Sequence, residues 1–269
     1  MTRTAPPTSR PDDTTTVSDI DEDRTTIDGG HMSLIEHLNE LRSRLIKIAI
    51  AVAVGAVIVW IFYDPILEFL KAPLDDADPN ARLILTDPLQ GLATRFKVAG
   101  YGGVALATPV ILWQLWRFIT PGLYPKERRY AVPFVASGVA LFVMGAGLAY
   151  WTLPRALSFL IDIGGEDIEA FYTPDKYIQL IVYMMLAFGL GFEFPIILVF
   201  LQLVGVLSYK RLIAWRRYAL IGIVVLVAVI TPSGDPISLA ALSVPMYLFY
   251  ELSILIGWLI TRRRVPAES

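Results

Sequence analysis

The sequence predicts an all-α membrane protein with six transmembrane helices and both chain ends in the cytoplasm. An amphipathic helix at the cytoplasmic interface is expected before the first span. Of the 269 residues, 55% are hydrophobic and only 18% are charged, whereas a soluble domain usually carries about 25% charged residues. Several apolar runs with few or no charges reach the ~18–20 residues needed to cross the hydrocarbon core. Lys and Arg gather in the segments that link these runs on one side, which sets the orientation.

A short polar loop, residues 117–130 (RFITPGLYPKERRY), separates two long apolar runs. The runs, residues 98–116 and 130–154, contain no charged residue. Two prolines and a glycine prevent a helix from continuing through the loop. Four cations place the loop on the cytoplasmic side. Glu127 is the single carboxylate among them and the first candidate functional residue.

The composition excludes several classes of function. The chain has no cysteine, so disulfides, thiolate metal sites and a cysteine nucleophile are impossible. Its two histidines, His31 and His37, precede the first span, so an intramembrane haem ligand or histidine relay is excluded. There is no phosphate-binding G-x-x-x-x-G-K-[ST] loop. We therefore expect no enzyme activity, no cofactor and no metal.

The N-terminal region divides into a tail and an amphipathic helix. Residues 1–31 are rich in Thr, Asp and Pro and are predicted to be a disordered cytoplasmic tail. Ser33 and Glu36 have the spacing of a capping box. The leucines that follow repeat at helical spacing and form one apolar stripe. The sequence predicts an interfacial helix that then turns into the bilayer.

The membrane domain is predicted to cover residues 32–261, followed by a basic cytoplasmic tail at 262–269. Residues 177–209 are too long for an untilted crossing and predict tilt or a kink near Pro195. The fifth span is predicted to be short, and a turn is predicted at residues 71–74 in the first outer loop. The expected spans are residues 45–63, 95–116, 130–154, 177–209, 218–232 and 236–261. The expected loops are outer at 64–92, 152–176 and 233–235, and inner at 117–130 and 208–217.

Two carboxylates fall inside predicted spans, Glu193 and Glu251. Centring a charge in hydrocarbon costs roughly 2.5–3.5 kcal/mol on insertion scales. Each is therefore either functional, being protonated or facing a polar groove or partner, or structural. In the structural interpretation of Glu193, its carboxyl bonds to carbonyls that Pro195 leaves free. Asp235, in a tight outer turn, is expected to cap the sixth span.

Glu40 and Glu127 both lie in cationic cytoplasmic stretches. Each alone is compatible with an ordinary surface charge. Together, on one cytoplasmic surface, they can bind a cationic segment.

Five segments in matching order resemble the TatC family, the signal-reading subunit of the twin-arginine protein translocase. They are HLNELRSRL (37–45), KAPL (71–74), FITPGLYPKERR (118–129), GFEFP (191–195) and TPSGDP to VPMYLFYE (231–251). Each is weak alone, but all five on a six-span topology are specific. The resemblance covers about residues 32–261.

The resemblance implies residue roles and partners. Glu40 and Glu127 would bind the paired arginines of a signal peptide, and Glu193 would face a concave groove. Pro73 matches the proline of the first outer turn. The implied partners are TatA- and TatB-type single-span subunits in a multi-copy complex, and signal peptides of folded cargo. Export would use the protonmotive force in a bacterial cytoplasmic membrane, without nucleic acid. The implied signal-peptide-binding residues are Glu40, Arg42, Phe118, Pro121, Leu123 and Glu127, and the implied partner-facing or intramembrane polar residues are Glu193, Thr231, Asp235 and Glu251.

The alternative function is an ion-coupled secondary transporter that uses Glu193 and Glu251. Such a carrier needs a midplane substrate path and usually broken helices in two related halves. No repeated motif links the halves of this sequence, which weakens that alternative.

Overall fold

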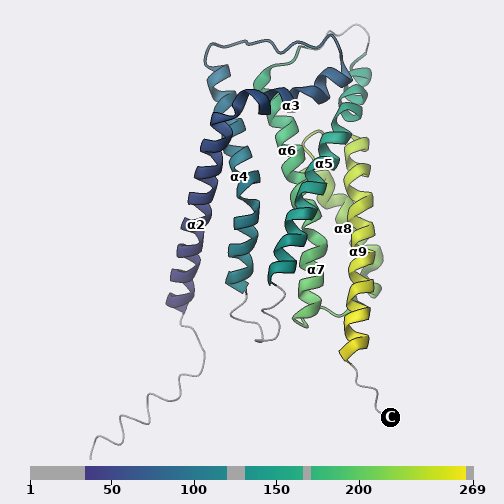
Figure 1. Cartoon of the computed structure of the whole chain (residues 1–269). Helices are drawn as coiled ribbons and strands as arrows, with labels where there is room; N and C mark the ends of the chain where they lie inside the picture. Colours follow the sequence, from purple (N-terminus) through teal and green to yellow (C-terminus); the bar gives the residue numbers. More distant parts are fainter. Residues whose placement is uncertain (1–33, 120–130, 166–170, 265–269) are drawn as a thin grey trace, which may run out of the picture. The chain divides into compact units, whose positions relative to one another are not determined.

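A computed structural model describes residues 34–119, 131–165 and 171–264. Contacts divide the chain into two units, with the boundary between Arg42 and Ser43. The elements of the described part are helices (Figure 1), apart from one isolated β-bridge between Leu83 and Tyr172. The helices are α2 (Leu34–Ile61), α3 (Tyr63–Ala77), α4 (Gln90–Ile119), α5 (Ala131–Gly164), α6 (Pro174–Phe192), α7 (Phe194–Leu203), α8 (Tyr209–Ile230) and α9 (Pro236–Arg264).

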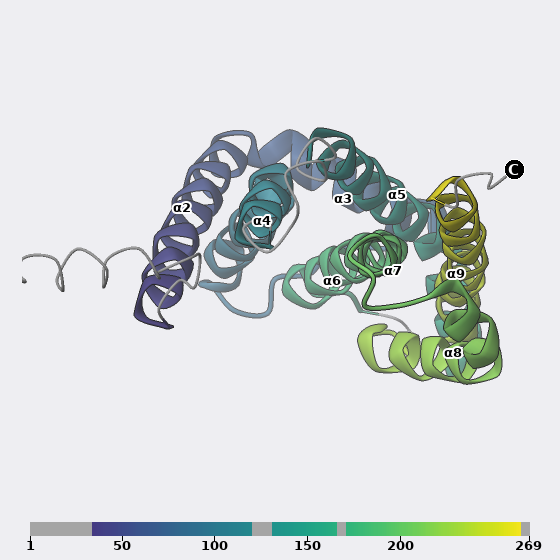
Figure 2. The same cartoon turned by 90° about the horizontal axis from the view of Figure 1, so that it is seen from below.

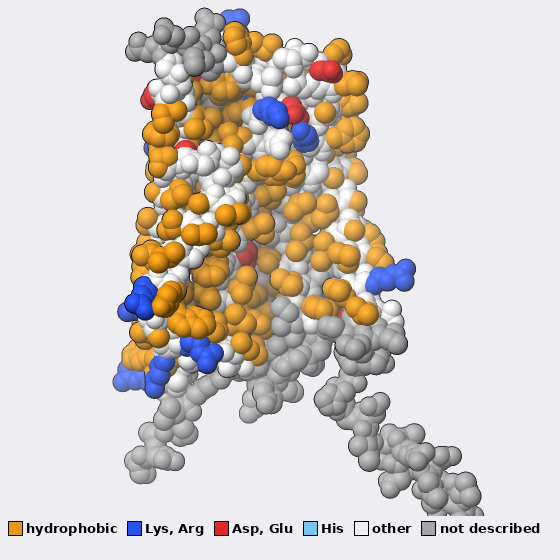
Figure 3. Space-filling view, turned by 180° about the vertical axis from the view of Figure 1, so that it is seen from behind, with side chains coloured by type: hydrophobic (Ala, Val, Ile, Leu, Met, Phe, Trp, Pro, Cys, Tyr) orange, Lys and Arg blue, Asp and Glu red, His pale blue; other side chains and the backbone are white. Residues whose placement is uncertain are grey.

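Within the described residues, six segments are long and apolar enough to cross a membrane, which confirms the six-span prediction. Figure 3 shows a lateral face covered largely by hydrophobic side chains, with Lys and Arg gathered toward its two ends. A hydrophobic band between charged ends is what hydrocarbon requires of a lipid-facing surface. The six segments are residues 38–61, 90–118, 132–164, 174–203, 209–230 and 236–262.

The predicted interfacial helix and the start of the first span both fall in α2, which covers Leu34–Ile61. No proline and no glycine lies between Leu34 and Val54 to end a helix. That the first part of α2 lies along the membrane interface stays a prediction. After α2 the chain resumes a helix almost at once, with Phe62 as the N-cap residue of α3.

Pro73 was predicted in a turn, and this prediction was wrong, because Pro73 lies inside α3. Proline has no N–H to donate to the carbonyl four residues earlier, here that of Phe69. The Tyr150 hydroxyl of α5 donates to that carbonyl at 2.9 Å instead. The neighbouring carbonyl of Leu70 accepts from the Tyr177 hydroxyl of α6 at 2.7 Å. A helix therefore replaces the predicted turn, and two tyrosines attach it to the bundle.

Several helices are longer than predicted. α5 continues to Gly164, past Pro154 and into the predicted outer loop. α8 begins at Tyr209, so the predicted basic inner loop at 208–217 is helical and the fifth span has 22 residues. The prediction of a short fifth span was wrong. Ser208 caps α8 by accepting from the backbone N–H of Arg211. α9 runs to Arg264, beyond the predicted start of the C-terminal tail.

The membrane helices of the second unit pack most extensively around α5 and α6 (Figure 2). Phe188 is fully buried between them. Glycines permit the close approach, since a Cβ on Gly145 would lie 2.4 Å from the Phe188 carbonyl oxygen. α7 packs against α9, which also contacts α5 and α8. In Figure 1, α3 lies crosswise to the long helices, near the start of α4.

Candidate functional site

The predicted kink in the fourth span is confirmed at Glu193. α6 ends at Phe192 and α7 begins at Phe194, with Pro195 in its first turn. The Glu193 N–H bonds to the Leu190 carbonyl at 3.1 Å instead of continuing the α-helical pattern. A proline in the first turn of a helix is well tolerated because that N–H has no helical partner. The break therefore places the Glu193 side chain at a junction between two helices of the membrane domain.

The Glu193 side chain is buried, with 8% of the residue exposed. Its Oε1 atom has no hydrogen-bond partner among the described residues. The structural interpretation, in which carbonyls freed by Pro195 bind this carboxyl, is thus not supported. A buried carboxyl without a partner is costly. Such a group is either uncharged or awaits a polar group from outside the chain.

Gly138 of α5 makes the space that the carboxyl occupies. A Cβ on Gly138 would lie 3.0 Å from Oε2 of Glu193 and 2.8 Å from Cδ1 of Leu112. Real Cβ contacts of this length are rare, so a larger residue would require the carboxyl or the Leu112 side chain to shift. Glu193 is therefore held between α5 and the Leu112 side chain of α4. Gly138 was not predicted from the sequence, because an isolated glycine in an apolar run is only a weak signal of a functional position.

Glu251 has a different environment. Its Oε2 atom lies 2.6 Å from Nη2 of Arg216 on α8. The Tyr247 hydroxyl donates to its Oε1 atom at 3.1 Å. The Glu251 side chain is 31% exposed. Glu251 is therefore neutralised within the chain, unlike Glu193, and a functional role for it stays a prediction.

The turn between α8 and α9 is closed by Asp235. Its Oδ1 atom accepts from the backbone N–H of Ser238 at 2.7 Å, which confirms the predicted cap of the sixth span. Its Oδ2 atom accepts from the Ser233 hydroxyl. Thr231 is 4% exposed, and its Oγ1 atom has no partner among the described residues. Of this pair, Thr231 is the one with unused hydrogen-bonding capacity.

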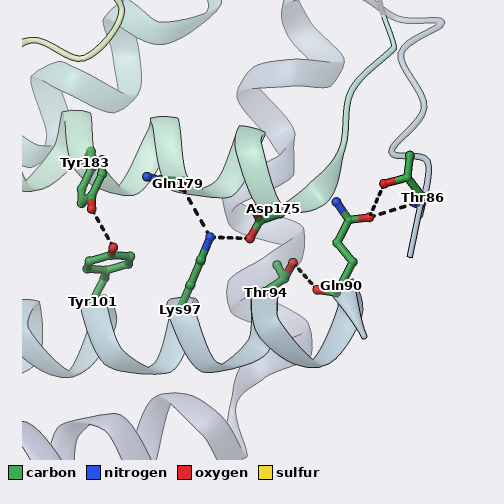
Figure 4. Close-up of polar contacts among 8 residues, drawn as sticks. All are labelled: Thr86, Gln90, Thr94, Lys97, Tyr101, Asp175, Gln179 and Tyr183. Atoms are coloured by element: carbon green, nitrogen blue, oxygen red, sulfur yellow. Dashed lines mark hydrogen bonds and ion pairs between the residues drawn. The ribbon is translucent and has the colours of Figure 1, made fainter. Parts of the chain in front are cut away.

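A polar ladder that sequence analysis missed joins α4 to α6 (Figure 4). Nζ of Lys97 lies 2.5 Å from Oδ1 of Asp175 and 3.4 Å from Oε1 of Gln179. Farther along, the hydroxyls of Tyr101 and Tyr183 are 2.9 Å apart. A lysine inside an apolar run is a signal for an interhelical partner, but the sequence does not say which residue it is.

The predicted signal-peptide-binding residues are only partly described. Glu127, Pro121 and Leu123 lie outside the described residues. Glu40 and Arg42 lie on the first part of α2, where Glu40 is half-buried and Arg42 is exposed. Phe118 lies near the end of α4, in the second unit. Whether these residues share one surface stays a prediction.

The fold and this site define a class: a polytopic helical membrane protein with a buried carboxyl at a broken span, one oxygen of which has no partner among the described residues. The chain also matches the family model described as "TatC: Sec-independent protein translocase protein (TatC)" over residues 36–245. A TatC protein of Frankia casuarinae is 38% identical over 250 residues, covering 88% of this chain and 69% of that protein. One of Aquifex aeolicus is 38% identical over 241 residues, covering 88% of this chain and all of that protein.

A solved structure agrees. The crystal structure described as the twin arginine translocase receptor TatC superposes with a TM-score of 0.72 at 38% identity. The match covers 84% of this chain and all of that one. The chain therefore belongs to the TatC family of Sec-independent protein translocase proteins. The ion-coupled transporter alternative is not supported, and the pairing of Glu251 with Arg216 removes one of its two carboxylates.

Proposed function

We propose that this chain is the non-enzymatic core and signal-receptor subunit of a bacterial twin-arginine export system. It would recognise signal peptides on folded cargo and work with TatA- or TatB-type single-span subunits, drawing on the protonmotive force. Family membership supports the receptor role. The observation that carries the partner role is the buried Glu193 carboxyl, which has an unpartnered oxygen beside Gly138.

The proposed membrane orientation follows from charge at the helix ends. Arg117 ends α4, Lys210 and Arg211 begin α8, and Arg262 lies in the last turn of α9. These ends lie on the same side of the second unit (Figure 1). The positive-inside rule assigns that side to the cytoplasm. In this proposal the chain is a multi-pass protein of the cytoplasmic membrane with both termini inside.

Signal recognition is proposed to rest on Glu40 and Glu127. A planar guanidinium binds a carboxylate through two parallel N–H···O bonds, which a lysine ammonium cannot do. Arg42 would help to orient Glu40, and Phe118, Pro121 and Leu123 would contact apolar parts of the peptide. Both carboxylates are needed because a twin-arginine motif presents two guanidinium groups.

In the membrane, the Glu193 carboxyl is proposed to bind a polar side chain of a single-span partner helix. A polar group that enters hydrocarbon needs a hydrogen-bonding partner there. The Glu193 carboxyl at the broken span supplies such a hydrogen-bonding partner, and no hydrogen bond of Glu193 Oε1 within the described chain has to be broken for this. The glycine at position 138 keeps the site open beside the carboxyl.

The test of signal recognition is a thermodynamic cycle with a synthetic signal peptide, at low salt in nanodiscs. A hydrogen bond to a charged group contributes roughly 1.5–3 kcal/mol, and the low end is about tenfold in affinity per carboxylate. We expect Glu40→Ala and Glu127→Ala each to weaken binding by that factor. Replacing the peptide arginines with lysines should weaken wild-type binding similarly, but should cost much less in the double variant.

Glu68→Ala is the matched control, because Glu68 is an exposed carboxylate on α3, which lies on the outer side in this proposal. It should bind the peptide like the wild type. An Arg-to-Lys penalty of equal size in the wild type and in the Glu40/Glu127 double variant would show that these carboxylates do not read the arginines.

A further inference from the structure

An apolar cavity of about 310 Å³ lies among α2, α3, α4, α5 and α6. This is roughly twice the ~150 Å³ of an engineered apolar cavity that stays dry and binds benzene. Its walls are hydrophobic throughout. Residues from each of these helices line it, among them Val59, Ile66, Val98, Phe142, Ala146 and Met185.

Water is a poor occupant of this cavity because a buried water needs about 2–4 polar partners. The tyrosines nearby direct their hydroxyls elsewhere. Tyr101 lines the cavity, but its hydroxyl bonds to that of Tyr183. Tyr150, stacked on the lining residue Phe69, donates to the Phe69 carbonyl. The cavity therefore suits a hydrophobic ligand.

The cavity opens onto the surface that faces the bilayer. Phe69 and Leu106 line it and are 50% and 52% exposed. Leu106 lies within the apolar segment 90–118 that crosses the membrane. The hydrophobic molecule that surrounds the protein at this depth is a lipid acyl chain.

Arg95 lies one helical turn before Val98 on α4 and supplies a charge for the headgroup. Its guanidinium packs over the rings of Trp60 and Tyr63, at 4.9 and 4.7 Å, and donates to the Trp60 carbonyl at 3.2 Å. Trp60 directly follows the lining residue Val59.

Within the described chain, no carboxylate forms an ion pair with Arg95, and its Nε atom is buried without a partner. Lys97, two residues farther along α4, is instead neutralised by Asp175. A fixed arginine without a protein counterion near the membrane interface is suited to a phosphate, which it can bind through two hydrogen bonds.

We propose that a bilayer phospholipid binds at this site, with one acyl chain in the cavity and its phosphate on Arg95. The lipid fills the space between α3 and the transmembrane helices. Because it binds only the folded protein, it stabilises the fold by an amount that grows with the lipid concentration. This inference is independent of the receptor role.

The test uses the full chain, purified in detergent and freed of lipid, with two probes. Dioleoylphosphatidylcholine has acyl chains and a phosphate, whereas dioleoylglycerol has the same chains without the phosphate. Native mass spectrometry measures retained lipid, and the thermal unfolding temperature is followed against lipid concentration. In the wild type we expect one retained phosphatidylcholine and about tenfold weaker binding of the diacylglycerol, the factor for one charged hydrogen bond.

Two kinds of variant separate the acyl site from the phosphate site. Ala146→Phe fills the cavity and should abolish retention of both probes. Ala140→Phe, at an exposed position of α5, is its control and should retain both. Arg95→Gln should weaken phosphatidylcholine to the level of diacylglycerol and leave diacylglycerol unchanged. Arg155→Gln is its control, because Arg155 also packs over a tryptophan ring, Trp151, but lines a separate pocket with Pro73 and Asp76.

If Ala146→Phe does not fold, Ala105→Leu fills the cavity from α4 by a smaller volume and should lower retention of both probes. Equal retention by the cavity-filling variants and Ala140→Phe would overturn the acyl site. An unchanged preference for phosphatidylcholine over diacylglycerol in Arg95→Gln would overturn the phosphate site.

Discussion

Glu193 and Glu251 are both carboxylates in apolar helices, yet the chain treats them differently. Glu251 forms an ion pair with Arg216 of the neighbouring helix α8 and accepts a hydrogen bond from Tyr247 of its own helix, α9. Glu193 lies at a break between α6 and α7, with an unpartnered oxygen beside Gly138. An intramembrane carboxylate is therefore a site for a partner only if the chain itself supplies no hydrogen bond or counterion to it. Sequence alone assigned both glutamates the same two interpretations.

The largest change in export is expected from substitutions of Glu193 itself. Glu193→Leu removes the polar group, whereas Glu193→Gln keeps most of its hydrogen-bonding capacity. If one hydrogen bond to a partner is lost, at about 1.4 kcal/mol, export should fall roughly tenfold in the Leu variant. The Gln variant should lose much less, and signal-peptide binding should survive in both. A cell-based export assay with a folded reporter, combined with peptide binding, checks this.

Glu251→Leu and Glu251→Gln are the matched pair at the other carboxylate, and both should export like the wild type. The comparison fails if Glu193→Leu exports normally, or if the two Leu variants lose export equally.

The next effect concerns the space beside Glu193. Gly138→Ala places a methyl group 3.0 Å from the carboxyl oxygen and 2.8 Å from Leu112. Both neighbours are the free ends of flexible side chains, which can shift, so we expect a cost at the low end of overpacking, about 1 kcal/mol. Gly147→Ala, on the same helix but with no atom within 4 Å of the added carbon, should be neutral or slightly stabilising. Chemical denaturation in detergent measures the difference.

If Glu193 is what crowds the methyl group, Glu193→Ala should recover part of the loss caused by Gly138→Ala. Equal free energies of unfolding for Gly138→Ala and Gly147→Ala would mean that Gly138 does not make the space for the carboxyl.

The smallest effect is expected at the ion pair. Arg216 is 47% exposed and Glu251 31% exposed, and such pairs contribute about 0–1 kcal/mol. A double-variant cycle of Arg216→Gln and Glu251→Gln should give a coupling free energy in that range, reduced by salt. A coupling indistinguishable from zero at low salt would remove the contrast with Glu193.

The sequence predicted the six spans, the break near Pro195 and the cap at Asp235, because each rests on a local pattern. Apolar length, a proline and a turn acid act within a few residues of where they stand. The sequence failed at Pro73, which is helical because Tyr150, far along the chain, binds the freed Phe69 carbonyl. It also failed to distinguish Glu193 from Glu251, because the partner of Glu251 is 35 residues away on another helix. Contacts between helices are not visible in local patterns.

The thermal unfolding temperature of the purified, partner-free chain tests the central claim most directly. Replacing a buried polar group that lacks a partner by an apolar one is neutral or stabilising, whereas breaking a partly exposed ion pair costs up to about 1 kcal/mol. We predict that Glu193→Leu leaves the unfolding temperature unchanged or raises it, while Glu251→Leu lowers it. If Glu193→Leu lowers the unfolding temperature at least as much as Glu251→Leu, the carboxyl of Glu193 serves the fold of the chain and not a partner.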